Sequence, residues 1–242
     1  MLARAAISTL IAVTLVAGGI GVTPAEASAF KVAPVRVSLD GTSRLSTLRL
    51  TNEGDEPVGV QITAWRWSQV DGEDKLEPSD EIIVNPVITQ LPPHATQLLR
   101  IAVTRPLGGA LEQSFRLMIE ELPQRGPSSG QVRALLRLSL PIFVKPAAPR
   151  IVLAPQLAAP DRLTLSNQGS VHVQVHSATL LRGTTPVARI EQPLYVLPGA
   201  ARTISLQPIA GTARLQRGEP LTLVAATDQG EMRAALAWPP AP

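Results

Sequence analysis

The sequence predicts an all-β protein with antiparallel pairing, most economically arranged as β-sandwiches. Apolar residues alternate with other residues at a period of two in almost every segment, which is typical of strands that bury one face. No segment shows the longer period of an amphipathic helix. The 23 prolines and 17 glycines are spread along the 242 residues. This distribution is expected where many short strands are joined by turns.

The first 29 residues are expected to be a secretory signal peptide rather than part of the fold. Residues 5–22 are almost entirely small or apolar, and Ala25-Glu26-Ala27 and Ala27-Ser28-Ala29 each fit a small-x-small cleavage site. The alternative is a retained membrane anchor, because the apolar run approaches the length that spans a bilayer. No basic stop follows the run, which favours cleavage and no membrane insertion afterwards.

Composition argues against several classes of protein. The chain has no cysteine, which excludes thiol chemistry and cysteine-ligated zinc. The formal net charge is only +3 and aromatic residues make up 3%. Nucleic-acid binding, which uses basic stripes with stacking aromatics, is therefore not expected. Nucleophile-elbow, zincin and phosphate-loop motifs are absent from the sequence, so we do not expect an enzyme.

The first half of the chain alternates in four clear segments, at 48–50, 58–64, 99–103 and 115–119. Turn residues separate them, including Asn52 to Pro57 and Leu91-Pro92-Pro93-His94. Asp71-Gly72-Glu73-Asp74 could suggest calcium, but it lacks the full calcium-loop pattern. A hairpin turn explains it more simply.

The boundary between two domains is expected near the proline-rich stretch Lys145-Pro146-Ala147-Ala148-Pro149-Arg150, which is stiff enough to restrict a hinge. The predicted domains are residues 30–145 and 146–242. The two halves echo each other: Leu-x-Leu-Thr-Asn-Glu-Gly at 48–54 parallels Leu-x-Leu-Ser-Asn-Gln-Gly at 163–169, and 91–93 parallels 197–199. This internal repeat predicts two similar sandwiches in tandem.

Histidines in the second half form one further polar pattern. His172, Gln174 and His176 alternate with three valines, so on a strand the two imidazoles share a face. Two imidazoles could bind a metal weakly. We instead expect a solvated face opposite Val171, Val173 and Val175, and neither metal nor other cofactor.

Residues 132–144 form the segment most suited to a partner. Its alternate positions are all apolar: Val132, Ala134, Leu136, Leu138, Leu140, Ile142 and Val144. Pro141 cannot donate to a β-ladder, which places it at an edge or a bulge. A long apolar edge strand is normally a liability, but it is useful if a partner adds a strand to it.

The order of motifs resembles the family of pilus and fimbrial periplasmic chaperones. The resemblance covers nearly all of the predicted mature chain. It rests on these motifs, in order: Val32-Ala33-Pro34-Val35-Arg36-Val37, Leu50-Thr51-Asn52, Asn85-Pro86, Leu91-Pro92-Pro93, Arg100, Phe115-Arg116-Leu117, Glu121-Leu122-Pro123, Leu140-Pro141-Ile142-Phe143-Val144-Lys145-Pro146 and Thr227-Asp228-Gln229-Gly230.

The resemblance implies two immunoglobulin-like sandwiches in a boomerang arrangement and a function in the periplasm. Such a chaperone holds fimbrial subunits by donor-strand complementation, here with residues 132–144, and delivers them to an outer-membrane usher. Trp65-x-Trp67 within the long segment 65–88 is similar to the branch that serves archaic or alternative ushers.

The resemblance also implies roles for charged residues. Arg36 matches the family's first cleft arginine, which holds the carboxylate at the subunit's C-terminus. The family's cleft lysine falls at Pro141, so Arg100 is our candidate for the second anchor. Glu121, Lys145 and Asp228 are expected to form an ion cluster between the domains.

The main alternative is a secreted β-sandwich adhesin or carbohydrate-binding module. Trp65 and Trp67 share a strand face and could stack on sugars, whereas the chaperone hypothesis places them in a core or an interface. Usher and fibre-subunit genes beside this gene would favour the chaperone.

Overall fold

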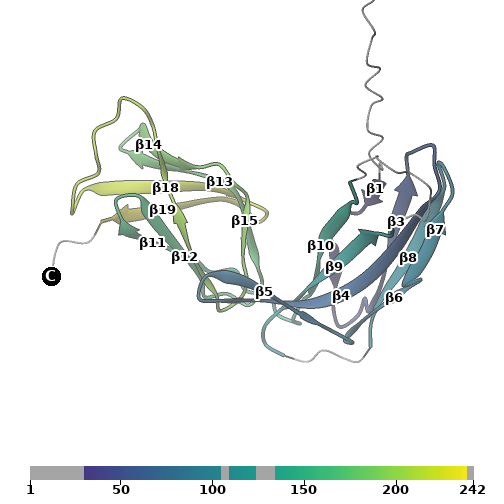
Figure 1. Cartoon of the computed structure of the whole chain (residues 1–242). Helices are drawn as coiled ribbons and strands as arrows, with labels where there is room; N and C mark the ends of the chain where they lie inside the picture. Colours follow the sequence, from purple (N-terminus) through teal and green to yellow (C-terminus); the bar gives the residue numbers. More distant parts are fainter. Residues whose placement is uncertain (1–29, 105–108, 124–133, 239–242) are drawn as a thin grey trace, which may run out of the picture.

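The computed structural model describes residues 30–104, 109–123 and 134–238, whose regular structure consists of β-strands (Figure 1). Within these ranges no helix is long and apolar enough to cross a membrane. The predicted signal peptide, residues 1–29, lies outside the described residues.

Strands β1 to β10 form the first domain, a sandwich of two sheets. The sheet β1-β3-β8-β6 consists of Phe30–Ala33, Leu45–Asn52, Thr96–Val103 and Ile82–Asn85. The sheet β2-β10-β9-β4-β5 consists of Val37–Leu39, Arg137–Val144, Gln113–Glu121, Val58–Val70 and Glu73–Pro78, and β7 (Ile88–Leu91) also pairs with β4. One core fills the space between the sheets, because each strand turns alternate apolar residues inward.

Strands β11 to β19 form the second domain, which has its own core. The sheet β11-β12-β16 consists of Leu153–Ala159, Arg162–Asn167 and Ala201–Ser205. The sheet β17-β14-β13-β18-β19 consists of Gln207–Pro208, Thr185–Ile190, Val173–Arg182, Pro220–Thr227 and Gly230–Ala237, with β15 (Leu194–Val196) on β13. The predicted all-β, two-domain architecture is confirmed.

The internal echo in the sequence corresponds to one repeated turn. Asn52 and Asn167 are both buried, and each side-chain amide donates to two or more backbone carbonyls. Each side-chain oxygen accepts the amide of the glycine two residues on, Gly54 or Gly169. A buried asparagine that satisfies a corner of the backbone is therefore the structural reason for the repeat.

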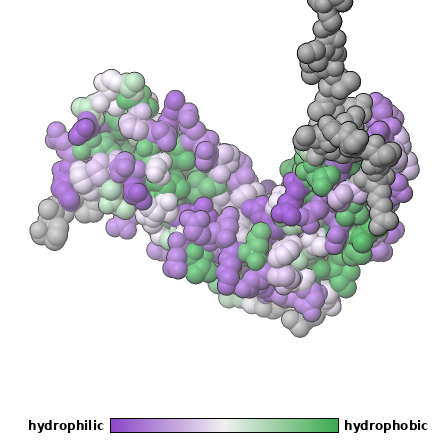
Figure 2. All heavy atoms as spheres, in the orientation of Figure 1, coloured by the Kyte–Doolittle hydropathy of each residue, from purple (hydrophilic) through white to green (hydrophobic). Residues whose placement is uncertain are grey.

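A long hairpin carries the first domain toward the second. Strand β4 is 13 residues long, more than twice the usual strand length. Asp71 and Gly72 both have positive φ, 53° and 81°, as a two-residue type I′ turn requires. The predicted hairpin turn is confirmed. Figure 1 places β5 at the bend where the two domains meet, and Figure 2 shows a largely hydrophilic surface there.

Candidate functional site: the cleft at the domain junction

Aromatic side chains from both domains pack at the junction. Trp67 of β4 and Phe143 of β10 cluster with Leu197 and Tyr195 of the second domain. The Trp67 ring centroid lies 6.1 Å from that of Phe143 and 5.4 Å from that of Tyr195. Trp67 and Phe143 are buried. Because Phe143 belongs to β10, this strand is fixed to the joint between the domains.

The tip of the hairpin makes polar contacts across the junction. The Gln69 side chain donates to the Tyr195 carbonyl at 3.0 Å and accepts from the Leu197 amide at 2.9 Å. The Asp74 carboxylate accepts from the Arg202 guanidinium at 3.0 Å. These paired backbone and charge contacts fix the orientation of the hairpin more than they add stability.

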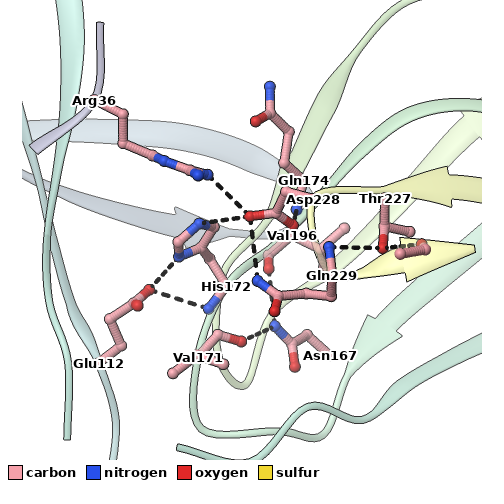
Figure 3. Close-up of polar contacts among 11 residues, drawn as sticks. Arg36, Glu112, Asn167, Val171, His172, Gln174, Val196, Thr227, Asp228 and Gln229 are labelled. Carbon is pink, nitrogen blue, oxygen red and sulfur yellow. Dashed lines mark hydrogen bonds and ion pairs between the residues drawn. The ribbon is translucent and has the colours of Figure 1, made fainter. Parts of the chain in front are cut away.

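Four charged side chains form a chain across the same junction (Figure 3). Glu112 Oε1 lies 2.7 Å from His172 Nδ1, and His172 Nε2 lies 3.3 Å from Asp228 Oδ2. The same Asp228 oxygen lies 2.9 Å from Arg36 Nη1. Glu112 and Arg36 belong to the first domain and the other two to the second, so the chain crosses the junction twice. We call these four residues the junction charge chain.

The backbone holds this chain in place. The Glu112 amide donates to the Ser170 carbonyl at 2.8 Å, and the His172 amide donates to Glu112 Oε1 at 3.0 Å. The Gln174 amide donates to the other Asp228 oxygen, Oδ1, at 2.9 Å. The His172 ring stacks on Phe143, with centroids 3.5 Å apart and an interplanar angle of 12°.

The environment of the chain favours its charged form. Burial alone would lower the pKa of His172, but the contacts with Asp228 and Glu112 outweigh burial and raise this pKa above 6.5. Burial alone would raise the pKa of Asp228, but His172, the Gln174 amide and Arg36 lower it to about 2. The junction therefore pairs an imidazolium with two carboxylates.

The predicted solvated face of the two histidines needs correction. His172 does not lie on a solvated face: it is 3% exposed, because Glu112 and Phe143 of the first domain cover it. His176, by contrast, is exposed as predicted. No group of three or more His, Cys, Asp or Glu side chains suited to a metal ion occurs in the described ranges.

The predicted ion cluster of Glu121, Lys145 and Asp228 is also different in the structure. Asp228 does lie at the junction, but its ion pairs are with Arg36 and His172. Glu121 is the last residue of β9. It lies about 26 Å along this nine-residue strand from the first residue, which follows Glu112. Its carboxylate accepts from the Leu136 amide instead. The glutamate at the junction is Glu112, which no motif in the sequence singled out.

Arg116 is the cleft residue that the sequence analysis did not select. It lies on the outer face of β9, directly across from Pro141 of β10 in the sheet register. Its guanidinium carbon lies 3.7 Å from the Trp67 ring centroid and 5.5 Å from that of Tyr195. Burial lowers the pKa of Arg116. In the part of the chain that the structure describes, this guanidinium has no carboxylate within ion-pair distance.

Arg100 lies elsewhere. It is exposed on β8, between the fully buried Leu99 and Ile101, so it points outward from the sheet β1-β3-β8-β6. Figure 1 shows that sheet on the side of the first domain away from the second domain. The structure therefore does not bring Arg100 to Arg36.

Strand β10 divides into two parts. Leu140, Ile142 and Val144 belong to the first domain's own core and are at most 6% exposed. The parallel strand β2 covers β10 only from Ile142 to Val144, so the edge of β10 from Arg137 to Pro141 is open in the described structure. Pro141 thus sits on an edge, as predicted.

The apolar row continues outward from the core along the open part. Leu138 packs partly against the core, Leu136 is half-buried and Ala134 is exposed. Val132 lies outside the described residues. A residue cannot fill its own core and a partner's groove at once. Leu140, Ile142 and Val144 are therefore core residues of this chain, which leaves only the outer members of the predicted row as candidates for a partner.

The tryptophans do not form a sugar-binding platform. Trp67 is 3% exposed, because it is enclosed in the junction. Trp65 is half-buried and its indole Nε1 donates to the Thr63 hydroxyl at 3.0 Å. Stacking on a sugar needs exposed rings, so the interface position predicted by the chaperone hypothesis agrees with Trp67.

Two immunoglobulin-like sandwiches are joined through the junction charge chain, and the edge of β10 beside them is open in the described structure. Residues 29–150, just over half of the chain, match the family described as "Pili and flagellar-assembly chaperone, PapD N-terminal domain". The chain belongs to this family of assembly chaperones. No protein of curated function matches the chain.

Solved chaperone structures share this fold. The CsuC chaperone, solved with the tip adhesion subunit CsuE of archaic Csu pili from Acinetobacter baumannii, is 18% identical, with a TM-score of 0.64 over 86% of this chain and 98% of that one. The E. coli chaperone DraB is 20% identical, with a TM-score of 0.61 over 87% and 98%. CupB2 of Pseudomonas aeruginosa is 20% identical, with a TM-score of 0.59 over 86% and 99%.

Proposed function

We propose that this chaperone captures fibre subunits by donor-strand complementation through the open edge of β10. The half-open edge is the observation that carries the proposal. Its unpaired backbone groups can recruit a strand of the subunit, while Ala134, Leu136 and Leu138 offer apolar side chains to an incomplete core. The complexes of CsuC with CsuE and of SafB with the pilin SafA support a subunit as the partner.

We further propose that Arg36 and Arg116 hold the C-terminal carboxylate of the subunit. Both residues lie at the junction, near Tyr195, and both guanidinium groups lower the pKa that burial raises in this phenol. Arg36 uses one N–H on Asp228 and is 39% exposed, so it retains donors for a second carboxylate. Arg116 supplies the positive charge that Pro141 cannot. Arg116 therefore replaces Arg100 in our proposal.

The cellular setting is part of the proposal. The predicted signal peptide places the mature chain, from residue 28 or 30, in the periplasm, where it would pass subunits to an outer-membrane usher. We also propose the domain boundary near residues 145 and 146; it is supported by the strand-free interval between Val144, where β10 ends, and Leu153, where β11 begins. The archaic or alternative branch stays a prediction.

The experiment co-expresses the tagged chaperone with the fibre subunit encoded beside its gene and measures the subunit recovered from periplasm. Leu136→Asn places an amide in the subunit's apolar groove and should abolish capture, since an unpaired buried amide costs about 1–3 kcal/mol on top of the lost apolar contact. Asparagine is preferable to aspartate because the backbone N–H of Leu136 donates to the Glu121 carboxylate. A second carboxylate at position 136 would lie beside that negative charge.

The matched control is Leu135→Asn, which changes the neighbouring, 49% exposed leucine. Leu135 precedes β10 and, unlike Leu136, is exposed in the free chain, so this variant should capture subunit normally. Equal capture by both variants, with unchanged circular dichroism, would show that the row does not enter the subunit.

A further inference from the structure

We propose that His172 is a positioning residue for Arg36. The imidazolium of His172 balances the negative charges of Asp228 and Glu112. Asp228 can therefore orient the Arg36 guanidinium while the positive charge of Arg36 stays available to a ligand in the cleft. This inference rests on the proposed function only for the purpose of Arg36 as an anchor. The contacts that carry it belong to the free chaperone and can be measured without a subunit.

The first argument is the order of the charges. Along the junction charge chain they alternate as Glu112 negative, His172 positive, Asp228 negative and Arg36 positive (Figure 3). The two positive and two negative charges cancel only while His172 carries its proton. With a neutral imidazole, the chain has one excess negative charge beside the cleft, which would repel a carboxylate ligand.

The second argument is burial. The Glu112 and Asp228 side chains are 0% and 6% exposed, so water compensates neither charge well. A buried carboxylate that loses its cationic partner is strongly destabilised. Glu112 Oε2 is buried without a hydrogen-bond partner in the described structure, so His172 carries most of the compensation.

The third argument is the shared oxygen. Asp228 Oδ2 accepts from Arg36 Nη1 at 2.9 Å and from Gln229 Nε2 at 3.2 Å and lies 3.3 Å from His172 Nε2, while Oδ1 accepts from the Gln174 amide. His172, Gln174 and Gln229 thereby fix the carboxylate from the second domain, and Arg36 contacts it from the first domain. Phe143 of β10 stacks on the imidazole, so the position of His172 is linked to that of β10.

The other groups around the imidazole do not replace this role. Tyr195 of β15 has its ring centroid 5.7 Å from the imidazole, and burial raises the pKa of this phenol, so it is neutral where His172 titrates. Arg116 lies on Trp67 and on Tyr195, 3.7 and 5.5 Å from their centroids. Phe143 carries no charge. The titration at the junction therefore belongs to His172.

The test is a nuclear magnetic resonance titration of the ¹⁵N-labelled mature chaperone without ligand. The imidazole signals of His172 and the Nη–Hη signals of Arg36, assigned by their loss in Arg36→Lys, are followed at low temperature as pH rises. We expect slowly rotating, resolved Arg36 signals at low pH. Their chemical shifts should change with the same midpoint as the imidazole signals, because deprotonation of His172 leaves more negative charge on Asp228 beside Arg36.

Two variants separate positioning from general stability. His172→Gln should abolish this change with pH, whereas His176→Gln, which changes an exposed histidine four residues on in β13, should titrate as the wild type does. Arg36 shifts that stay constant through the His172 midpoint, that change equally in folded His172→Gln, or Arg36 signals that are never resolved would overturn the inference. If His172→Gln does not fold, the wild-type titration alone decides.

Discussion

In our proposal, Arg116 supplies the positive charge that Pro141, which stands where the family has a lysine, cannot supply. The strand register sets it across from Pro141, and the rings of Trp67 and Tyr195 support a guanidinium that lacks a carboxylate partner within the described residues. A partly buried cation over aromatic faces is stabilised by the rings but still favours an anion.

Replacement of Arg116 by alanine should weaken subunit capture by about ten- to a hundred-fold, the loss of one charge-assisted hydrogen bond of about 1.5–3 kcal/mol. Arg36→Ala should have a similar effect. Affinity for the subunit, measured by titration calorimetry, checks both. Arg100→Ala is the matched control and should bind as the wild type. Full affinity in a well-folded Arg36→Ala/Arg116→Ala double variant would contradict the anchor.

The junction charge chain also predicts how stability depends on pH. The pKa of His172 is raised in the folded state, so its contribution is complete below the unfolded pKa, about 6.5, and is lost as pH rises through the folded value. The pKa of Asp228 is lowered to about 2, so its contribution is present above about 4 and is lost as pH falls toward 2. Thermal unfolding should show greatest stability between these limits. An unchanged alkaline decline in His172→Gln would argue against this assignment.

At the scale of elements, the two asparagine-cornered turns are alike but have different surroundings. A Cβ atom on Gly169 would lie 2.4 Å from the Arg150 carbonyl oxygen and 2.8 Å from the Val152 amide nitrogen. The linker is bonded at this point, since the Ser170 amide donates to the Arg150 carbonyl at 2.7 Å. On Gly54 the nearest atom would be the Asn52 side-chain oxygen, at 3.3 Å.

Gly169→Ala should therefore push the linker away from the second domain and destabilise the protein by about 1–3 kcal/mol or more, as overpacking does. Gly54→Ala, the equivalent change in the first domain, should cost less because its Cβ would meet one atom at 3.3 Å and not two backbone atoms closer than 3 Å. Urea unfolding of both variants checks the difference. A loss for Gly169→Ala no larger than that for Gly54→Ala would show that the linker is not held there.

At the scale of the whole molecule, the first testable feature is the start of the mature chain. We predict cleavage after Ala27 or Ala29, because both follow the apolar run and complete a small-x-small site. Intact-mass measurement of the periplasmic fraction should give a chain that begins at Ser28 or Phe30. A membrane-bound form that keeps Met1 would contradict the prediction.

The joint is the second feature of the whole molecule. An aromatic cluster, a hairpin tip and the junction charge chain all connect the domains, so the junction should transmit a change at His172 to both Arg36 and β10. The short proline-containing linker further restricts motion of one domain relative to the other.

The sequence by itself determined the elements of this protein. Period-two alternation, Asp71-Gly72 and the paired Asn-x-Gly corners are local signals, because side-chain direction in a strand and turn conformation depend on neighbouring residues. They predicted the strands, the hairpin and the tandem domains. The tertiary structure decided which residues meet. Pairing across sheets and between domains joins positions far apart in the chain, so it buried His172, placed Glu112 and Arg116 at the junction but not Glu121 or Arg100, and divided β10 into a core half and an open half.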